Sequence, residues 1–403
     1  MMFNEIELSS VITDIAAGPF GSNLKVSCFV PYGFPIIDGA NLKGFKVTDN
    51  LTKFVTEEKA RSLSRSIARR GDVIITISGT LGQIAYIPDD SMFEEYLCSQ
   101  RQFRVSFDSS RVYVPYLVFY FHTNEGQGKI LSFANQTGVP ALSQPLKNFR
   151  KIRIQLPSYT EQRRIASVIE AINDKIECNQ KVNDNLEQQV QAYFQELFVD
   201  NADPAWTLGT ISDLGTVVGG STPSKSKPEY YTEDGIAWIT PKDLSINKAK
   251  FISHGENDIT ELGLKNSSAS IMPEGTVLFS SRAPIGYIAI ASGEVTTNQG
   301  FKSVVPKPEI GTAYVYCFLK HNLPVIEGMA SGSTFKEVSG STMKNVPAVI
   351  PDTETLTCFN DFCAPIFAHQ RILEEQNQSL AALRDSLLPK LMSGEIDVSA
   401  IKL

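Results

Sequence analysis

The amino-acid sequence predicts a mixed α/β protein that is built twice over, as two similar domains that are each followed by a long helix. Three observations predict this fold. The chain of 403 residues is long for a single core and suits two domains with connecting elements. One half of the sequence is similar to the other, and the hydrophobic period changes where each half ends. The composition, 42% hydrophobic and 20% charged, is typical of globular chains.

The internal repeat is clearest in one glycine-containing stretch of each half. ARRGDVIITISGTLGQIAYI (Ala68 to Ile87) aligns without gaps with MPEGTVLFSSRAPIGYIAIA (Met272 to Ala291). Each copy has the pattern of a turn, a strand of apolar and β-branched residues, a loop of small residues and a second strand. Four further pairs of segments match in the same order, which disfavours a chance likeness. These pairs are Leu8 to Ser22 with Leu208 to Thr222, Gly33 to Leu42 with Gly235 to Leu244, Ser99 to Val105 with Asn298 to Val304, and Asn135 to Pro157 with Ala330 to Pro351.

After each half, apolar residues recur on alternating steps of three and four, which predicts a long helix with a heptad seam. The first helix, from about Thr160 to Phe198, would be ~55 to 60 Å long. Such helices can pair with each other or pack on their own domains. Polar seam residues such as Asn179 either set the register or are ordinary interface residues. The predicted seams contain Ile169, Ile172, Ile176, Asn179, Leu186 and Val190 in the first helix, and Ile366, Leu373, Leu380, Leu383 and Leu387 in the second.

No catalytic motif was found in the sequence. GQGK (Gly126 to Lys129) lacks the spacing and the following Ser or Thr of a phosphate-binding loop. Metalloprotease, nucleophile-elbow, dinucleotide-binding, adenine-methyltransferase and nuclease patterns are missing. Four scattered histidines and six scattered cysteines suggest neither a metal site nor a disulfide framework. With no signal peptide pattern and no apolar stretch of ~20 residues, we expect a cytoplasmic protein without a membrane partner.

The net charge of −7 argues against a protein that coats DNA through bulk positive charge. Each half nevertheless has loops, at equivalent places, that combine glycine with cationic, amide and hydroxyl side chains, the residue types that contact phosphates and base edges. A solvated turn is the alternative for any single residue. The candidate DNA contacts are Ser22, Asn23, Lys25, Lys43, Lys46, Ser78, Thr80, Gln83, Arg101, Gln102, Arg104, Gln136 and Thr137 in the first half, and Ser221, Thr222, Ser224, Lys225, Lys227, Lys242, Ser281, Arg282, Asn298, Gln299, Ser333, Thr334 and Lys336 in the second.

The repeat and two further segments resemble the specificity subunits of type I restriction-modification systems, called HsdS. The segments are QLPSYTEQRRIASVIEAINDKI (Gln155 to Ile176) and LRDSLLPKLMSGEIDV (Leu383 to Val398). The resemblance covers essentially the whole chain. One departure is TCFNDFCAPIFAHQ (Thr357 to Gln370) at the start of the second helix, where the first has EQRR (Glu161 to Arg164). Whether both helical regions contact their partners identically therefore stays open.

The resemblance implies two target-recognition domains with twisted, mostly antiparallel sheets at residues 1–157 and 200–351. It also implies two helical spacers at 158–199 and 352–403, which form an antiparallel coiled coil. Each domain would read one half of a split site in double-stranded DNA, and the helices would fix the distance between the halves. The helices would bind two modification subunits, which carry S-adenosylmethionine and methylate adenine, and a restriction subunit would join them. This chain would hold no cofactor and no metal and would catalyse nothing.

Two other classes of protein remain as alternatives. One is a coiled-coil protein-interaction scaffold without DNA readout, which the paired cationic loops disfavour. The other is an enzyme such as a fused methyltransferase or nuclease, which the missing motifs disfavour.

Overall fold

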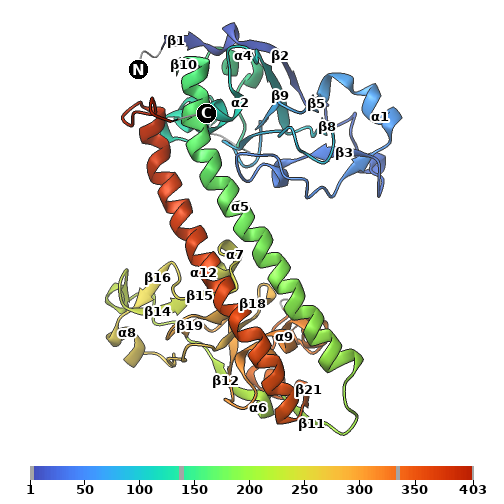
Figure 1. Ribbon diagram of the computed structural model, residues 1–403, viewed down its shortest axis with the longest axis vertical. Coiled ribbons are helices and arrows are strands. Elements are labelled where there is room, and N and C mark those ends of the chain that lie inside the picture. Colours follow the sequence, from blue (N-terminus) through green and yellow to red (C-terminus); the bar gives the residue numbers. More distant parts are fainter. Residues whose placement is uncertain (1–3, 136–139, 333–335, 402–403) are drawn as a thin grey trace. The chain divides into compact units, whose positions relative to one another are not determined.

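The computed structural model describes residues 4–135, 140–332 and 336–401, and the chain divides into two compact units (Figure 1). The first unit contains the residues up to Lys175 together with those from Leu380 onward, and the second is Ile176–Ser379. Each unit holds one set of sheets, called domain 1 and domain 2 below, and one part of each long helix. The boundaries expected at residues 157, 199 and 351 treat the helices as segments of their own, and they stay a prediction.

Domain 1 is built from two four-stranded sheets and a two-stranded ribbon. The first sheet has the antiparallel order β2-β9-β6-β7. The second has the order β4-β3-β8-β5, in which β3 and β8 are parallel. Strands β1 and β10 form the antiparallel ribbon. The bounds are β1 Asn4–Glu7, β2 Ile12–Ala17, β3 Phe34–Ile37, β4 Phe54–Val55, β5 Ile67–Arg69, β6 Val73–Thr76, β7 Ile84–Tyr86, β8 Glu95–Cys98, β9 Gln102–Phe107 and β10 Arg153–Leu156, with helices α1 Glu57–Ser62, α2 Val114–Phe121, α3 Asn124–Leu131 and α4 Pro145–Arg150.

Domain 2 repeats this plan. Its first sheet has the order β12-β20-β17-β18-β15, and its second has the order β13-β16-β14-β19, in which β14 and β19 are parallel. Strands β11 and β21 form the ribbon. The bounds are β11 Thr207–Thr210, β12 Gly215–Gly219, β13 Tyr231–Thr232, β14 Ile236–Ile239, β15 Phe251–Ile252, β16 Asn257–Ile259, β17 Val277–Ser281, β18 Ile285–Ala291, β19 Thr296–Thr297, β20 Lys302–Pro306 and β21 Pro347–Ile350, with helices α6 Ile211–Leu214, α7 Pro241–Ile246, α8 Glu261–Lys265, α9 Thr312–His321, α10 Leu323–Gly328 and α11 Gly340–Lys344.

The repeated glycines stand where the backbone requires them. Gly71 before β6 and Gly275 before β17 both have φ of +84°. Gly82, between β6 and β7, and Gly286, at the start of β18, have φ of +85° and +91°. Side chains other than glycine are strained in this left-handed region, so both turns need glycine. The matching strand orders and turns confirm the predicted fold class of two similar, mostly antiparallel α/β domains.

The two long helices are α5, Tyr159–Gln195, which continues into a π-helical turn at Glu196–Asp200, and α12, Thr353–Met392 (Figure 1). In the first unit, the start of α5 and the end of α12 share the core of domain 1. In the second unit, the end of α5 and the start of α12 share the core of domain 2, with the Tyr193 and Phe359 rings 5.8 Å apart. The helices are thus antiparallel in each unit. They pack both on each other and on the domains, so the two predicted modes of packing occur together.

The structure corrects the predicted seam of the second helix. In α5 the predicted positions Ile169, Asn179 and Val190 are buried, and Ile172, Ile176 and Leu186 are half-buried. In α12, Leu373 is buried, while Ile366, Leu380 and Leu387 are half-buried and Leu383 is 47% exposed. The side chains buried along α12 include Phe367, Gln370, Leu388 and Leu391. The predicted seam is therefore right at Leu373 and wrong at Leu383, and next to Ile366 and Leu387 the buried side chain is the following residue, Phe367 or Leu388.

Polar residues join the helices inside the second unit. Asn179 Nδ2 of α5 donates to Asn377 Oδ1 of α12 at 2.9 Å, and Gln370 Nε2 donates to the carbonyl of Asn183 at 3.1 Å. The Asn179 side chain is buried, where an unmatched amide is costly, so this pair favours one register of the two helices.

Domain 2 is tied to both helices by a buried ionic cluster. The Lys250 ammonium, just before β15, contacts the Glu187 carboxylate of α5 and donates to Gln370 Oε1 of α12 at 2.5 Å. It also lies 4.0 Å from the centre of the Phe367 ring. Lys320 Nζ of α9 adds a second cation 2.6 Å from Glu187. Burial opposes ionisation of Glu187, but the two lysines outweigh it and lower its pKa to about 2.

The corresponding joint of domain 1 has a different chemistry. Arg384 of α12 lies 5.4 Å from the centre of the Phe45 ring and donates from Nη1 to Asn173 Oδ1 at 3.1 Å. Phe45 also packs edge-on against Phe119, with ring centres 4.8 Å apart. The cation–π contact of domain 1 thus has its cation on α12 and its ring in the domain, whereas that of domain 2 has its cation, Lys250, in the domain and its ring, Phe367, on α12.

We predict that Glu187→Gln destabilises the protein by about 3 kcal/mol at pH 7, because the pKa of Glu187 falls from 4.5 to about 2 on folding. A lowered pKa gives stability that is present at neutral pH and is lost as the pH falls from 4.5 towards 2. The difference between the variant and the wild type should therefore shrink to about half at pH 3. Denaturant unfolding of the variant and the wild type at pH 7 and pH 3 measures this difference in the free energy of unfolding.

The matched control is Glu375→Gln, which removes a carboxylate of α12 whose partner is the partly exposed Arg371. It should change the free energy of unfolding by less than about 1 kcal/mol. Equal losses in the two variants, or a Glu187→Gln effect that does not depend on pH, would contradict the role given to the cluster.

Candidate nucleic-acid interface

Four loops of domain 1 that are far apart in the sequence line one open groove of about 1040 Å³. They are the loop after β2, the segment after α1, the end of β6 and the turn before β9. The groove contains the predicted residues Asn23, Ser78, Arg101 and Arg104. The structure thus brings candidate DNA contacts from three separate predicted loops onto one surface.

Glycines hold the loop after β2 against the turn before β9. The Gly18 N–H donates to the Gln102 carbonyl at 2.8 Å. A Cβ at Gly18 would lie 1.8 Å from the Ser99 carbonyl oxygen, and one at Gly21 would lie 2.6 Å from Gln100 Oε1. At Gly18 a side chain would displace the backbone of Ser99, whereas at Gly21 it would displace only the end of the Gln100 side chain. The two loops are therefore fixed to each other, which keeps their exposed side chains in place.

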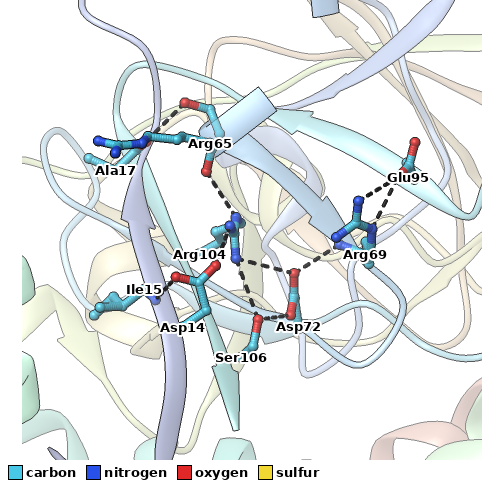
Figure 2. Close-up of polar contacts among 10 residues, drawn as sticks. Asp14, Ile15, Ala17, Arg65, Arg69, Asp72, Glu95, Arg104 and Ser106 are labelled. Carbon is cyan, nitrogen blue, oxygen red and sulfur yellow. Dashed lines mark hydrogen bonds and ion pairs between the residues drawn. The ribbon is translucent and has the colours of Figure 1, made fainter. Parts of the chain in front are cut away.

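Arg104 lines the groove and is held by the polar contacts that Figure 2 shows. Its Nη2 lies 2.6 Å from Asp14 Oδ2, and its Nη1 lies 3.9 Å from Asp72 Oδ2. Its Nε donates to the Arg65 carbonyl at 3.1 Å. The Arg104 side chain is only 10% exposed, so most of its donors are committed to the protein. Its position favours holding β2, β9 and the Arg65 segment together over contacting DNA.

The two carboxylates around Arg104 have opposite pKa shifts. The hydrogen bond from Arg104 holds the pKa of Asp14 below its usual range, whereas burial raises the pKa of Asp72. Ser106 donates from its hydroxyl to Asp72 Oδ1 at 2.5 Å. Within the network drawn in Figure 2, Arg104 supplies the central positive charge, and its removal would leave Asp72 buried without that partner.

Sequence reasoning missed two residues of the groove, Arg65 and Phe20. Both are exposed and line it. Arg65 belongs to a run with Arg69 and Arg70, and nothing in the run distinguishes the three. The structure distinguishes them, because two of the three arginines have partners outside the groove. Arg69 Nη2 is 3.0 Å from Glu95 Oε1, and Arg70 Nη2 donates to the Ser91 carbonyl at 2.7 Å. Neither of these two lines the groove.

The other predicted residues of domain 1 fall into three groups. Ser22, Lys25, Lys43 and Thr80 are exposed on loops, but they are not part of the groove lining. Gln83 and Gln102 turn inward, since Gln83 Nε2 donates to the Gly39 carbonyl at 3.0 Å and Gln102 is buried and accepts from the Ser99 hydroxyl. Lys46 lies at the helix joint, 3.3 Å from Asp174 of α5. Gln136 and Thr137 lie outside the described residues.

In domain 2, five predicted residues line one pocket of about 370 Å³. Trp238 closes one side and donates from its indole N–H to the Ser221 carbonyl at 2.9 Å. The Thr222 hydroxyl donates to Gln299 Oε1, and Lys242 pairs with Glu256 at 2.5 Å. Gly220 holds this loop as Gly18 holds its counterpart, because a Cβ there would lie 2.0 Å from the Asn298 carbonyl. The five predicted residues are Thr222, Lys225, Lys242, Asn298 and Gln299.

The remaining predicted residues of domain 2 lie outside this pocket. Ser281 is buried and donates to the Gly300 carbonyl at 3.1 Å, while Arg282 lies 3.6 Å from Glu337. Lys227 pairs with Glu229 at 3.6 Å. Ser221, Ser224 and Lys336 lie on loops near the surface, and Ser333 and Thr334 lie outside the described residues.

Among the described residues, no cluster of three or more histidine, cysteine, aspartate and glutamate side chains is arranged to hold a metal ion. The six cysteines are free thiols. In the same part of the chain, no helix has the length and apolar character needed to cross a membrane.

The proteins similar to this chain include two type I restriction enzyme specificity subunits and one solved structure. The type I restriction enzyme MjaIX specificity subunit of Methanocaldococcus jannaschii is 40% identical over 191 residues, which are 45% of this chain and 44% of that protein. The HindI specificity subunit of Haemophilus influenzae is 22% identical over 83% of this chain and 88% of its own length. The crystal structure of a type I restriction-modification S subunit from M. genitalium shares the fold, with a TM-score of 0.57, 15% identity and 96% of each chain covered.

The family model described as the type I restriction modification DNA specificity domain matches residues 30–188 and again residues 205–375. The two matches fall on the two halves that the internal repeat and the strand orders define. The chain therefore belongs to the type I restriction modification DNA specificity domain family.

Proposed function

We propose that this chain is the DNA-sequence-specificity subunit of a type I restriction-modification complex. Domain 1 and domain 2 each read one half of a bipartite site in double-stranded DNA. The observation that carries the proposal is that, in both domains, the loop after β2 or β12 and the turn before β9 or β20 line one concave surface. Loops held on a rigid sheet are the usual carriers of such recognition.

Local charge supports this use of the groove in domain 1 despite the net charge of −7. Arg65 and Arg101 are exposed along it, and Arg104 offsets Asp14 on its floor. Cations of this kind bind phosphates and set the register of the protein on the duplex, while amide side chains such as Asn23 read base edges. Because the rest of the chain is acidic, we expect the isolated subunit to bind DNA weakly.

The helices would fix the distance between the two half-sites and dock the partners. Apolar side chains on the outer faces of α12, such as Ile372 and Leu383, are 51% and 47% exposed, which suits a protein interface. We assign catalysis to two modification subunits that carry S-adenosylmethionine and methylate adenine, and to a restriction subunit that joins them. This chain would supply recognition and no cofactor.

Mapping methylated adenines in the DNA of cells that express the complex tests the function. The expected result is one motif with two specific parts and an unread spacer. A complex that assembles but methylates without any motif, and binds all duplexes equally, would overturn the proposal in favour of an interaction scaffold.

We predict that Arg65→Ala in the assembled complex weakens DNA binding and lowers the slope of log affinity against log salt by about 1, since one phosphate contact is lost. Arg69→Ala is the matched control, because Arg69 is an exposed arginine of the same run that pairs with Glu95 outside the groove. Arg104→Ala should instead lower the melting temperature of the protein, because it leaves Asp72 buried without its cation. If Arg65→Ala and Arg69→Ala have the same salt slope, Arg65 is not a phosphate contact.

We predict that Lys225→Ala weakens recognition of the half-site that domain 2 reads by more than Arg282→Ala does. Lys225 lines the pocket with Asn298 and Gln299, whereas Arg282 lies outside it against Glu337. Methylation rates on sites altered in one half at a time measure both variants. An effect of Lys225→Ala on the other half-site would contradict the assignment.

We predict that matched insertions of seven residues, one in α5 after Asn179 and one in α12 before Asn377, lengthen the tolerated spacer. One heptad adds ~10 Å of helix, which corresponds to about three base pairs. Both helices must change together because Asn179 and Asn377 are bonded across the pair. Methylation of a series of sites with different spacers measures the effect, and an unchanged optimum would exclude the helices as the spacing element.

A further inference from the structure

The loop after β2 presents an aromatic side chain that the polar recognition surface does not account for. We propose that Phe20 makes an apolar contact with the 5-methyl group of a thymine in the half-site that domain 1 reads. This inference rests on the proposed function, and it adds a specific base to it. Domain 2 has no counterpart of this contact in the loop that occupies the same place.

Phe20 is 83% exposed and lies on the lining of the groove beside Gly21 and Asn23. A single exposed apolar residue is ordinary on a protein surface. The groove that Phe20 lines also contains Arg65 and Arg101, several small polar residues, and apolar residues such as Leu63 and Ile77. A lining that combines cations, amides and an exposed ring suits a ligand that carries charged, polar and apolar groups together.

The loop holds Phe20 in a fixed position. Its start is held by the Gly18 N–H bond to Gln102, and its turn is closed by the Asn23 N–H, which donates to the Phe20 carbonyl at 2.8 Å. Pro19 restricts the backbone immediately before the ring. Little conformational freedom of the backbone is therefore lost when the ring meets a ligand, which favours a specific contact.

The chemistry of the duplex identifies the ligand group. The major groove presents hydrogen-bond donors and acceptors on every base pair, and the thymine methyl is the apolar group among them. Asn23, Gln100 and Arg101 line the same groove and carry amide and guanidinium groups of the kind that read base edges. A contact with thymine is thus consistent with direct readout by the same loop.

Domain 2 shows the difference at the equivalent place. Gly220 is pressed against the Asn298 carbonyl as Gly18 is pressed against the Ser99 carbonyl, so the residues two positions later correspond. These are Phe20 in domain 1 and Thr222 in domain 2. The Thr222 hydroxyl donates to Gln299 and makes this position polar. The two loops therefore hold different side chains towards their grooves.

A cycle of one protein change and one DNA change tests the contact. Once the site is mapped, the assembled complex with wild-type chain or Phe20→Ala is titrated with duplexes in which each thymine of the half-site is replaced in turn by deoxyuridine, which lacks only the methyl. We expect one position at which deoxyuridine weakens binding by the wild type about fourfold, the worth of one buried methyl. With Phe20→Ala the same replacement should have no further effect.

Two variants serve as controls. Phe20→Leu keeps an apolar side chain and should retain the dependence on the methyl group. Tyr32→Ala removes an aromatic residue of domain 1 that is 88% exposed but does not line the groove, and it should bind both duplexes as the wild type does.

Three results would overturn the inference. They are a half-site without A·T pairs, additive effects of Phe20→Ala and deoxyuridine at every position, and a Phe20-dependent rise in 2-aminopurine fluorescence, which would show insertion between base pairs instead. Loss of subunit assembly in Phe20→Ala would point to a protein contact and would also count against it. The proposed function fails separately, if the wild-type complex does not prefer the mapped site over a scrambled duplex.

Discussion

Each domain completes its core with helix residues from a distant part of the chain, and the rest of the structure depends on this burial. Leu388 and Leu391, near the C-terminus, share a core with Ile165 of α5 and the first sheet of domain 1. Val190 and Phe194 do the same with Phe359 in the second unit. Neither helix could leave its partner without exposing the apolar side of a domain, which would cost far more than a surface contact. The antiparallel pair is therefore part of both domains, not only a connection between them.

Both domains pack on the helices through apolar side chains, but the polar residues at the two contacts differ. At domain 2, a carboxylate on α5 is paired with two lysines, and the pKa of Glu187 is lowered to about 2. At domain 1, Arg384 lies over the ring of Phe45. A buried ion pair adds less stability than its geometry suggests, because both charges lose water.

The recognition loops likewise share a frame, namely the backbone contacts that hold them, and differ in the side chains that they expose. In domain 1, Gly18 lets the loop after β2 lie against the turn before β9, and in domain 2, Gly220 does the same for the loop after β12 and the turn before β20. This close approach brings distant segments onto one surface. The side chains on that frame then differ, with Phe20 in one domain and Thr222 in the other. Arg104 belongs to the frame, because its donors hold β2, β9 and the Arg65 segment from inside.

The sequence by itself determined the two-fold plan, the class of the domains, the two long helices and the general place of the loops. Glycine positions, strand periodicity and heptad spacing are local properties that a repeat makes visible. Only the tertiary structure decided which side chain of each loop faces the groove. Gln83, Gln102 and Arg104 look like DNA contacts in sequence but bond inward, and Arg65 cannot be told from Arg69 until Glu95 is seen beside one of them. The same reason applies in α12 to Gln370, a polar residue that is buried against Lys250 and Asn183 and gives no hydrophobic signal. Burial of a polar group depends on a partner far away in the chain, and no local pattern records that partner.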